Sequence, residues 1–279
     1  TRVRSSAASD VYKRQALEGL SRALERPAPF DPAHSRRRFS ISMSDIGEIF
    51  FLPTLMQALR ASAPGVALVT VRPGAVPVAD ALDNGSADLA IGHLPAVRRS
   101  SGFHQRRLFD QRYVCLMRRA HPLLQLPGRS TSKAMKAKGS ALSLEAFCAA
   151  EHLVVQAAGT AHGRVDEALR RQGIERRVAL TVPHFVATGH LLAATDLVAT
   201  VPQRLAERMT TPFGLVALPH PARLPHSPIS MMWPARLHRD AATQWLRATV
   251  LKLFAQEEEA GDENERLTGQ SVATPRARS

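Results

Sequence analysis

The residues best placed to do chemistry lie in two turns, each between a strand-like segment and a helix-like segment. Ser44 and Asp45 form the first turn, after FSISM and before an apolar helical run. Gly159 to His162 form the second turn, after HLVVQ and before the run that begins at Gly163. The first turn of a helix carries unpaired N–H groups and a partial positive charge. Both turns therefore favour binding of an anion, above all a carboxylate.

Each of these side chains also has a purely structural interpretation. Ser44, Asp45 and Thr160 are of the types that cap helix N-termini, where a cap stabilises by about 1 kcal/mol. Two histidines, His162 and His184, stand where helices are expected to begin. The helix dipole disfavours their protonated form there, so either could be a neutral structural residue. Capping and ligand contact are compatible, and both interpretations stay open at this point.

Sequence patterns typical of catalysis or metal binding are absent. The chain has no G-x-S-x-G, G-x-G-x-x-G, phosphate-binding loop or H-E-x-x-H pattern. Its 11 histidines are scattered, and His184 and His190 are six residues apart, which does not place them on one helical face. Cys115 lies in a strand-like apolar segment, which indicates a small buried residue. We expect no enzyme activity, no metal and no cofactor.

Length and composition limit the class of protein. A chain of 279 residues suggests about two domains. Hydrophobic residues make up 44% and charged residues 22%, which excludes a mainly disordered, fibrous or membrane-spanning chain. Two cysteines cannot form a disulfide scaffold and match no zinc spacing. We therefore expect a reducing, cytoplasmic location and no membrane association.

The charge balance is strongly basic. The chain holds 37 Lys and Arg against 24 Asp and Glu, so its formal net charge is +13. Such a charge favours contact with nucleic acid or another polyanion. The alternative is a general bias toward arginine, because these residues are spread along the chain and no single expected helix collects them.

The two ends and one internal stretch differ from the rest. The chain starts with Thr1, so we expect a fragment. Residues 1–14 lack the apolar core of a signal peptide and are expected to be unstructured or foreign to the chain. Residues 15–28 read as the end of a helix that stops at a pair of prolines. The polar segments 127–141 and 256–279 are expected to be a surface loop and a disordered tail.

Between the ends, strand and helix patterns alternate. The first part reads as strand, helix, strand, helix, strand, followed by a further strand. The expected strands and helices of this part are 39–44, 48–61, 66–71, 78–84, 88–91 and 112–117. The same rhythm continues with strands at 152–156, 178–182, 196–200, 215–218 and 229–233, and with helices at 163–171, 184–194, 202–209 and 240–254. This order predicts parallel sheets with helices on both faces.

The alternation predicts an α/β fold of two Rossmann-like lobes. We expect lobe 1 to span 37–118 and 228–255, and lobe 2 to span 119–227. In open α/β sheets, ligands bind at the carboxyl ends of the strands. The turns at Ser44 and Gly159 lie at such ends, so we expect a ligand cleft between the lobes.

Many stretches of the chain resemble one family, the LysR-type transcriptional regulators. These stretches are FDPAHSRRRF (30–39), SDIGEIFFLPTLMQAL (44–59), DLAIGHLP (88–95), QRRLFDQRYVCLMRRAHP (105–122), VPHFVATG (182–189), TDLVATVPQR (195–204), PFGLVALPHPARLP (212–225) and RDAATQWLR (239–247). Residues 17–256 resemble the effector-binding (substrate-binding) domain of that family. The similarity is to the NahR, DntR and NodD branch, which responds to aromatic acids, nitroaromatic breakdown products and flavonoids.

The resemblance implies a fold, a role and a set of site residues. It implies a two-lobed fold of the type 2 periplasmic-binding-protein kind. It also implies that DNA is contacted only through an N-terminal winged helix-turn-helix, which is missing here, and that residues 15–28 end the linker helix. By position, the implied ligand-binding residues are Ser44, Asp45, Arg72, Pro73, His93, Gly159, Thr160, His162, His184, Phe185 and Pro202.

Their roles in binding are expectations of the same kind. Main-chain N–H groups and the hydroxyls of Ser44 and Thr160 would hold a carboxylate, and Phe185 and Pro202 would flank an aromatic ring. Arg72 would counter the carboxylate directly or be solvated, and Phe185 could equally be a core residue. The predicted ligand is thus a small aromatic acid effector.

Two other interpretations remain, and the resemblance also predicts an assembly. A periplasmic-type solute-binding protein would have a similar shape, but the signal peptide is missing. An enzyme on the same scaffold, such as a dehydratase, would need a paired acid and base that the sequence does not offer. The resemblance implies a homodimer or tetramer through helices 48–61 and 184–194, packed head to tail.

Overall fold

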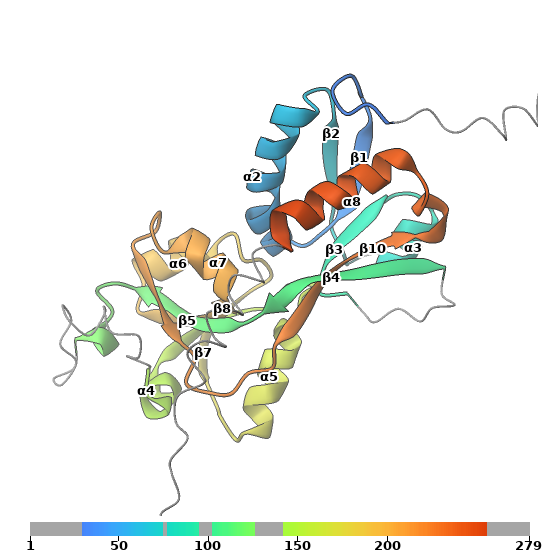
Figure 1. Cartoon of the computed structure of the whole chain (residues 1–279). Helices are drawn as coiled ribbons and strands as arrows, with labels where there is room; N and C mark the ends of the chain where they lie inside the picture. Colours follow the sequence, from blue (N-terminus) through green and yellow to red (C-terminus); the bar gives the residue numbers. More distant parts are fainter. Residues whose placement is uncertain (1–29, 75–76, 95–101, 126–141, 256–279) are drawn as a thin grey trace, which may run out of the picture.

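A computed structural model of the chain describes residues 30–74, 77–94, 102–125 and 142–255. These residues form two lobes, each built around a five-stranded mixed sheet (Figure 1). The expected foreign segment, linker helix, surface loop and tail lie outside the described residues, at 1–14, 15–28, 127–141 and 256–279.

Lobe 1 is the sheet β2-β1-β3-β10-β4 with three helices. Strand β1 runs parallel to β2 and β3, whereas β10 is antiparallel to β3 and β4. The strands are β1 (Arg38–Ser42), β2 (Ala67–Val71), β3 (Leu89–Gly92), β4 (Phe103–Gln111) and β10 (Ser227–Pro234). The helices are α2 (Asp45–Ser62), α3 (Val78–Asp83) and α8 (Ala241–Phe254).

Four phenylalanines join α2, β4 and α8 in the core of lobe 1. Phe50, Phe51, Phe109 and Phe254 are all buried, and their ring centroids lie 4.8 to 6.1 Å apart in tilted or edge-on pairs. Each such pair stabilises the fold by about 0.5–1.5 kcal/mol, in addition to the contribution of the apolar area that it buries. The cluster fixes the position of α2, whose first turn faces lobe 2.

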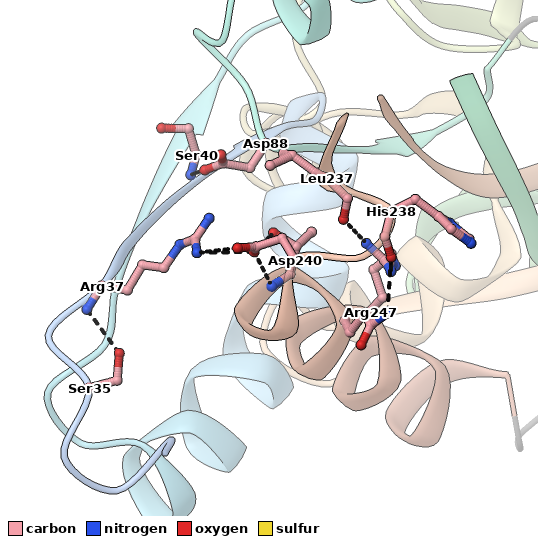
Figure 2. Close-up of polar contacts among 10 residues, drawn as sticks. Ser35, Arg37, Ser40, Asp88, Leu237, His238, Asp240 and Arg247 are labelled. Atoms are coloured by element: carbon pink, nitrogen blue, oxygen red, sulfur yellow. Dashed lines mark hydrogen bonds and ion pairs between the residues drawn. The ribbon is translucent and has the colours of Figure 1, made fainter. Parts of the chain in front are cut away.

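The returning C-terminal segment is tied to lobe 1 by polar contacts (Figure 2). Asp240 caps α8 by accepting hydrogen bonds from the Thr243 amide (2.8 Å) and hydroxyl (2.6 Å), and it pairs with Arg37 at 3.0 Å. Arg247 donates to the Leu237 carbonyl at 3.1 Å, which holds the turn before the helix. The last helix therefore packs on lobe 1.

Lobe 2 is the sheet β7-β6-β8-β5-β9 with four helices. Leu153, Ala199 and Leu205 lie in its main core cluster. The strands are β5 (Tyr113–Arg118), β6 (Glu151–Val155), β7 (Arg177–Val182), β8 (Leu197–Pro202) and β9 (Leu215–Pro219). The helices are α4 (Leu144–Ala149), α5 (His162–Arg171), α6 (Thr188–Ala194) and α7 (Gln203–Met209).

The structure corrects several features of the predicted organisation. Both sheets are mixed, not parallel, because β10 and β5 run antiparallel to their neighbours. Strand β4 was not predicted, and neither was α4. Strand β5 belongs to the sheet of lobe 2, so lobe 1 ends before Tyr113 and not at residue 118. Helix α6 begins at Thr188, not at His184.

The lobes are joined where β4 runs on into β5 and where β10 returns to lobe 1 (Figure 1). Helix α2 also bridges them, because Ile46 and Ile49 pack against the core of lobe 2. Across the described ranges, we find no helix with the length and apolarity to cross a membrane.

Candidate ligand-binding cleft

A cavity lies between the lobes at the carboxyl ends of their strands. Its walls come from α2, β3, β4 and β10 on one side and from the turn before α5 and the start of α7 on the other. The lining residues are Ser44, Ile46, Gly47, Phe50, Phe51, Gly92, His93, Phe109, Gln111, Gly159, Thr160, Ala161, Pro202, Arg204, Leu205 and Ile229. Most of these side chains are apolar, with a few polar groups among them, which is the composition of small-molecule sites.

Two long helices begin at this cavity, one in each lobe. Ser44 is the N-cap of α2 and makes no side-chain capping bond, so its hydroxyl is not used by the helix. Ala161 is the N-cap of α5 and has no side chain that could cap it. Both residues line the cavity. The N–H groups and partial positive charges of two helices therefore meet where an anion could bind.

Arg204 adds a full positive charge to the same wall. Its guanidinium carbon lies 4.0 Å from the centre of the Phe109 ring and 5.4 Å from that of Phe50, both in lobe 1. These distances are typical of cation–π contacts. A cation held on aromatic rings, beside two helix N-termini, suits a ligand that carries both a carboxylate and an aromatic ring.

Five of the predicted site residues line the cavity: Ser44, His93, Gly159, Thr160 and Pro202. The Thr160 hydroxyl donates its hydrogen to the Ala157 carbonyl at 2.8 Å. Its oxygen can therefore accept a hydrogen bond from a ligand but cannot donate one. The imidazole Nδ1 of His93 lies 3.3 Å from the Pro228 carbonyl. Contact of these five residues with a ligand stays a prediction.

Three other predicted residues of lobe 2 do not line it. His162 is buried, its Nε2 lies 2.8 Å from the Thr200 carbonyl, and its ring packs against Phe185 with centroids 4.9 Å apart. Burial lowers the pKa of His162, so the ring is neutral at physiological pH. Phe185 is fully buried in the core of lobe 2, and His184 is exposed. The structure thus favours the structural interpretation of His162 and Phe185.

The remaining three, Asp45, Arg72 and Pro73, are not among the residues that line the cavity. Arg72 is exposed. Pro73 lies very close to the turn of lobe 2: a Cβ atom added to Gly159 would be 2.8 Å from the Cβ of Pro73. Gly159 has φ +71°, a conformation that favours glycine. Pro73 and Gly159 therefore bring the two lobes into contact beside the cavity.

Asp45 makes a second contact between the lobes. Its carboxylate is buried and accepts a hydrogen bond from the main-chain N–H of Phe185 across the cleft. Its other oxygen accepts from the N–H of Ile46 at 3.0 Å. The carboxylate is thus committed to main-chain donors of both lobes.

The cavity is partly open, and the space inside it together with the adjoining solvent is about 520 Å³. This lies in the range of small-molecule sites, about 300–1,000 Å³.

Several lining residues were missed from the sequence. Phe109 and Gln111 belong to β4, which was not recognised as a strand. Arg204 stands in the stretch VPQR, where a charged residue in a short helix reads as solvent-exposed. A useful signal was available for Arg204, since it lies two residues after Pro202, at a helix start that was predicted to face the cleft.

The structure also bears on metal and cysteine chemistry. Within the ranges that the structure describes, no group of three or more His, Cys, Asp or Glu side chains could hold a metal ion. Burial raises the pKa of the Cys115 thiol to about 12, so a thiolate nucleophile is disfavoured there. Cys115 is a buried apolar residue, as its strand-like context predicted.

Comparison with known proteins assigns this two-lobed structure to a family. The family model of the LysR substrate binding domain matches residues 32–255. The chain belongs to the LysR substrate-binding-domain family. The relatives in this family are transcriptional regulators and not enzymes.

Individual relatives agree with this assignment. The chain is 46% identical over 239 residues to the HTH-type transcriptional activator NahR of Pseudomonas putida, covering 86% of this chain and 74% of that protein. It is 44% identical to the activator NagR of a Ralstonia species, covering 86% and 75%. The regulatory domain of MexT, a transcriptional activator in Pseudomonas aeruginosa, superposes with a TM-score of 0.64 at 30% identity, covering 80% of this chain and 100% of that chain.

Proposed function

We propose that this LysR-type domain binds a small aromatic carboxylate between its lobes and thereby controls a cytoplasmic, DNA-binding regulator. The observation that carries the proposal is the meeting of two helix N-termini and Arg204 at one cavity whose walls hold the rings of Phe50 and Phe109. The resemblance to the branch that responds to aromatic acids points to the same class of ligand.

The regulatory signal would arise from a difference in the ligand's affinity for two arrangements of the protein. A ligand shifts an equilibrium between two arrangements of the lobes or subunits only by its difference in affinity for them. A DNA-reading module in the whole protein would sense that change.

Thermal unfolding with a panel of acids tests this function. Benzoate, salicylate and their ring-substituted relatives are added at millimolar concentration, with benzamide as a neutral analogue and acetate as an acid without a ring. A ligand of the native state must raise the midpoint of unfolding. We expect a rise with one or more aromatic acids, and a smaller or no rise with benzamide and acetate. No rise with any aromatic acid, or an equal rise with benzamide, would contradict the proposal.

We also propose that the domain assembles with a second copy through α2 and the segment 184–194. The supporting observation is Val186, just before α6, whose exposed fraction is 56%, high for an apolar side chain. The exposed positions of α2 include Pro53, Gln57 and Ala61. Sedimentation at micromolar concentration tests this: Val186→Lys should lower the fraction of dimer or tetramer, while a monomeric wild type would contradict the proposed assembly.

A further inference from the structure

A second hollow lies on lobe 2 and shares no lining residue with the cavity between the lobes. It is an open groove between the exposed face of α5 and the loop that joins β9 to β10. Together with the adjoining solvent, the space in the groove is about 830 Å³. Its charged lining residues are Arg164, Glu167, Arg171 and Arg223.

Helix α5 carries two of the three arginines. Arg164 and Arg171 are seven residues apart, which places them on one face of the helix, about 10 Å apart along its axis. Val165 and Leu169 lie on another face and are buried, so the arginine face is turned to solvent. Glu167 pairs with Arg171, whereas Arg164 forms no ion pair with any residue that the structure describes.

The third arginine, Arg223, belongs to a loop whose main chain is held in place. The side chain of Gln172 donates to the Arg223 carbonyl at 2.8 Å and accepts from the Arg223 N–H at 3.3 Å. The neighbours Ala222 and Leu224 pack in a core cluster of lobe 2. The Arg223 side chain itself is exposed. The loop therefore presents this guanidinium to the groove from a fixed backbone.

The charges of the groove indicate the chemistry of a ligand. Three guanidinium groups against one carboxylate leave a net charge of +2 within it. Guanidinium groups form bidentate, charge-assisted hydrogen bonds with phosphate oxygens. Cations that come from both walls of a wide groove suit a ligand with several negative charges better than one with a single carboxylate.

We propose that this groove binds a small phosphate-bearing molecule with two or more negative charges. Arg164 and Arg223 hold its phosphate oxygens from opposite walls, and Arg171 contributes while it stays paired with Glu167. The site is separate from the cavity proposed for the aromatic acid, so the two proposals stand or fall independently.

Calorimetric titration with inorganic pyrophosphate tests the inference. We expect binding at millimolar concentration, and weaker binding of orthophosphate because it carries fewer charges. Arg164→Gln and Arg223→Gln should each weaken pyrophosphate binding by about fivefold or more. Glu167→Gln should strengthen it by roughly two- to fivefold, because the variant removes a negative charge and frees Arg171. A gain of binding cannot come from a loss of folded protein.

Two matched variants separate this groove from general charge and from the cavity between the lobes. Arg170 is an exposed arginine of α5 that does not line the groove, so Arg170→Gln should leave pyrophosphate binding near the wild-type value. Arg204→Gln should do the same, because Arg204 lines only the cavity between the lobes.

Four results would overturn the inference. They are no binding of pyrophosphate by the wild type at millimolar concentration, unchanged binding in Arg223→Gln, a loss in Arg170→Gln equal to that in Arg223→Gln, and a loss in Arg204→Gln. A short DNA duplex is titrated alongside. If Arg223→Gln weakened binding of the duplex while the wild type bound no pyrophosphate, the groove would be a nucleic-acid surface instead.

Discussion

Arg204 brings a permanent positive charge into a largely apolar cavity. Its guanidinium lies on Phe109 and Phe50, so rings of lobe 1 hold a cation of lobe 2 beside the N-terminus of α2. A planar guanidinium suits both bidentate contact with a carboxylate and stacking on a ring. At the scale of the residue, Arg204 is the side chain most suited to select acids over neutral analogues.

Replacing Arg204 by glutamine should therefore weaken binding of an aromatic acid. The loss of a charge-assisted hydrogen bond costs about 1.5–3 kcal/mol, which corresponds to roughly 10- to 150-fold weaker binding. The ratio of the dissociation constant of benzoate to that of benzamide should therefore rise toward one. Calorimetric titration of both ligands measures these quantities.

Arg208 supplies the matched control for this variant. It lies one turn further along α7, 5.8 Å from the Phe50 ring centre, and does not line the cavity. Arg208→Gln should leave acid binding near the wild-type value. Equal losses in the two variants would mean that Arg204 acts only through the packing of α7 on α2.

The sequence predicted the turns of the site better than its side chains. Ser44 and Thr160 line the cavity. They could be predicted because a strand-to-helix turn is a local pattern that is visible in the sequence. Phe185 and His162 point into the core of lobe 2, and that choice depends on long-range packing with Tyr113 and Thr200. Local patterns carry no information about such packing.

At the scale of the element, α6 is positioned by a glycine. Gly189 is buried against Phe213, and a Cβ atom there would lie 2.5 Å from the Phe213 ring. Gly189→Ala should lower the free energy of unfolding by about 1–3 kcal/mol, because the ring or the helix must shift. Urea denaturation measures this change.

A second glycine gives the comparison. A Cβ atom on Gly163 in α5 would have no neighbouring atom within 4 Å, so Gly163→Ala should be neutral or stabilising by up to about 1 kcal/mol. If Gly189→Ala were as stable as Gly163→Ala, the close packing of α6 on Phe213 would be wrong.

Most elements could be predicted from the sequence, and the exceptions have physical causes. The helix α2 and the strands β1 to β3 stand out as apolar runs bounded by turn residues. Strand β4 was missed because its first half, FHQRR, is polar and lies at the edge of the sheet. The same strand carries Phe109 and Gln111 into the cavity, so an error in one element removed two residues from the predicted site.

At the scale of the whole molecule, buried and half-buried histidines make stability depend on pH. Burial lowers the pKa of His152, His162 and His220, and that of His220 to about 4, with Arg176 acting in the same direction. The unfolded chain takes up protons below about pH 6.5, whereas the folded chain resists them. The free energy of unfolding should therefore be constant above pH 6.5 and fall as the pH drops toward 4.

Urea denaturation at several pH values measures this loss. Replacing His220 by glutamine should reduce the dependence on pH by about 1–3 kcal/mol over this range. Stability that rises between pH 6.5 and 4.5 would contradict the assigned neutral state of the buried histidines.

The two-lobed architecture places the turns at Ser44 and Gly159 on either side of one cavity. A ligand that binds there must contact both lobes, whereas a ligand bound elsewhere need not. The most direct measurement is amide hydrogen exchange with the aromatic acid that stabilises the protein most. The account predicts slower exchange at both Ser44–Gly47 and Gly159–Ala161 on saturation. Protection confined to one lobe, or lying outside these two turns, would contradict it.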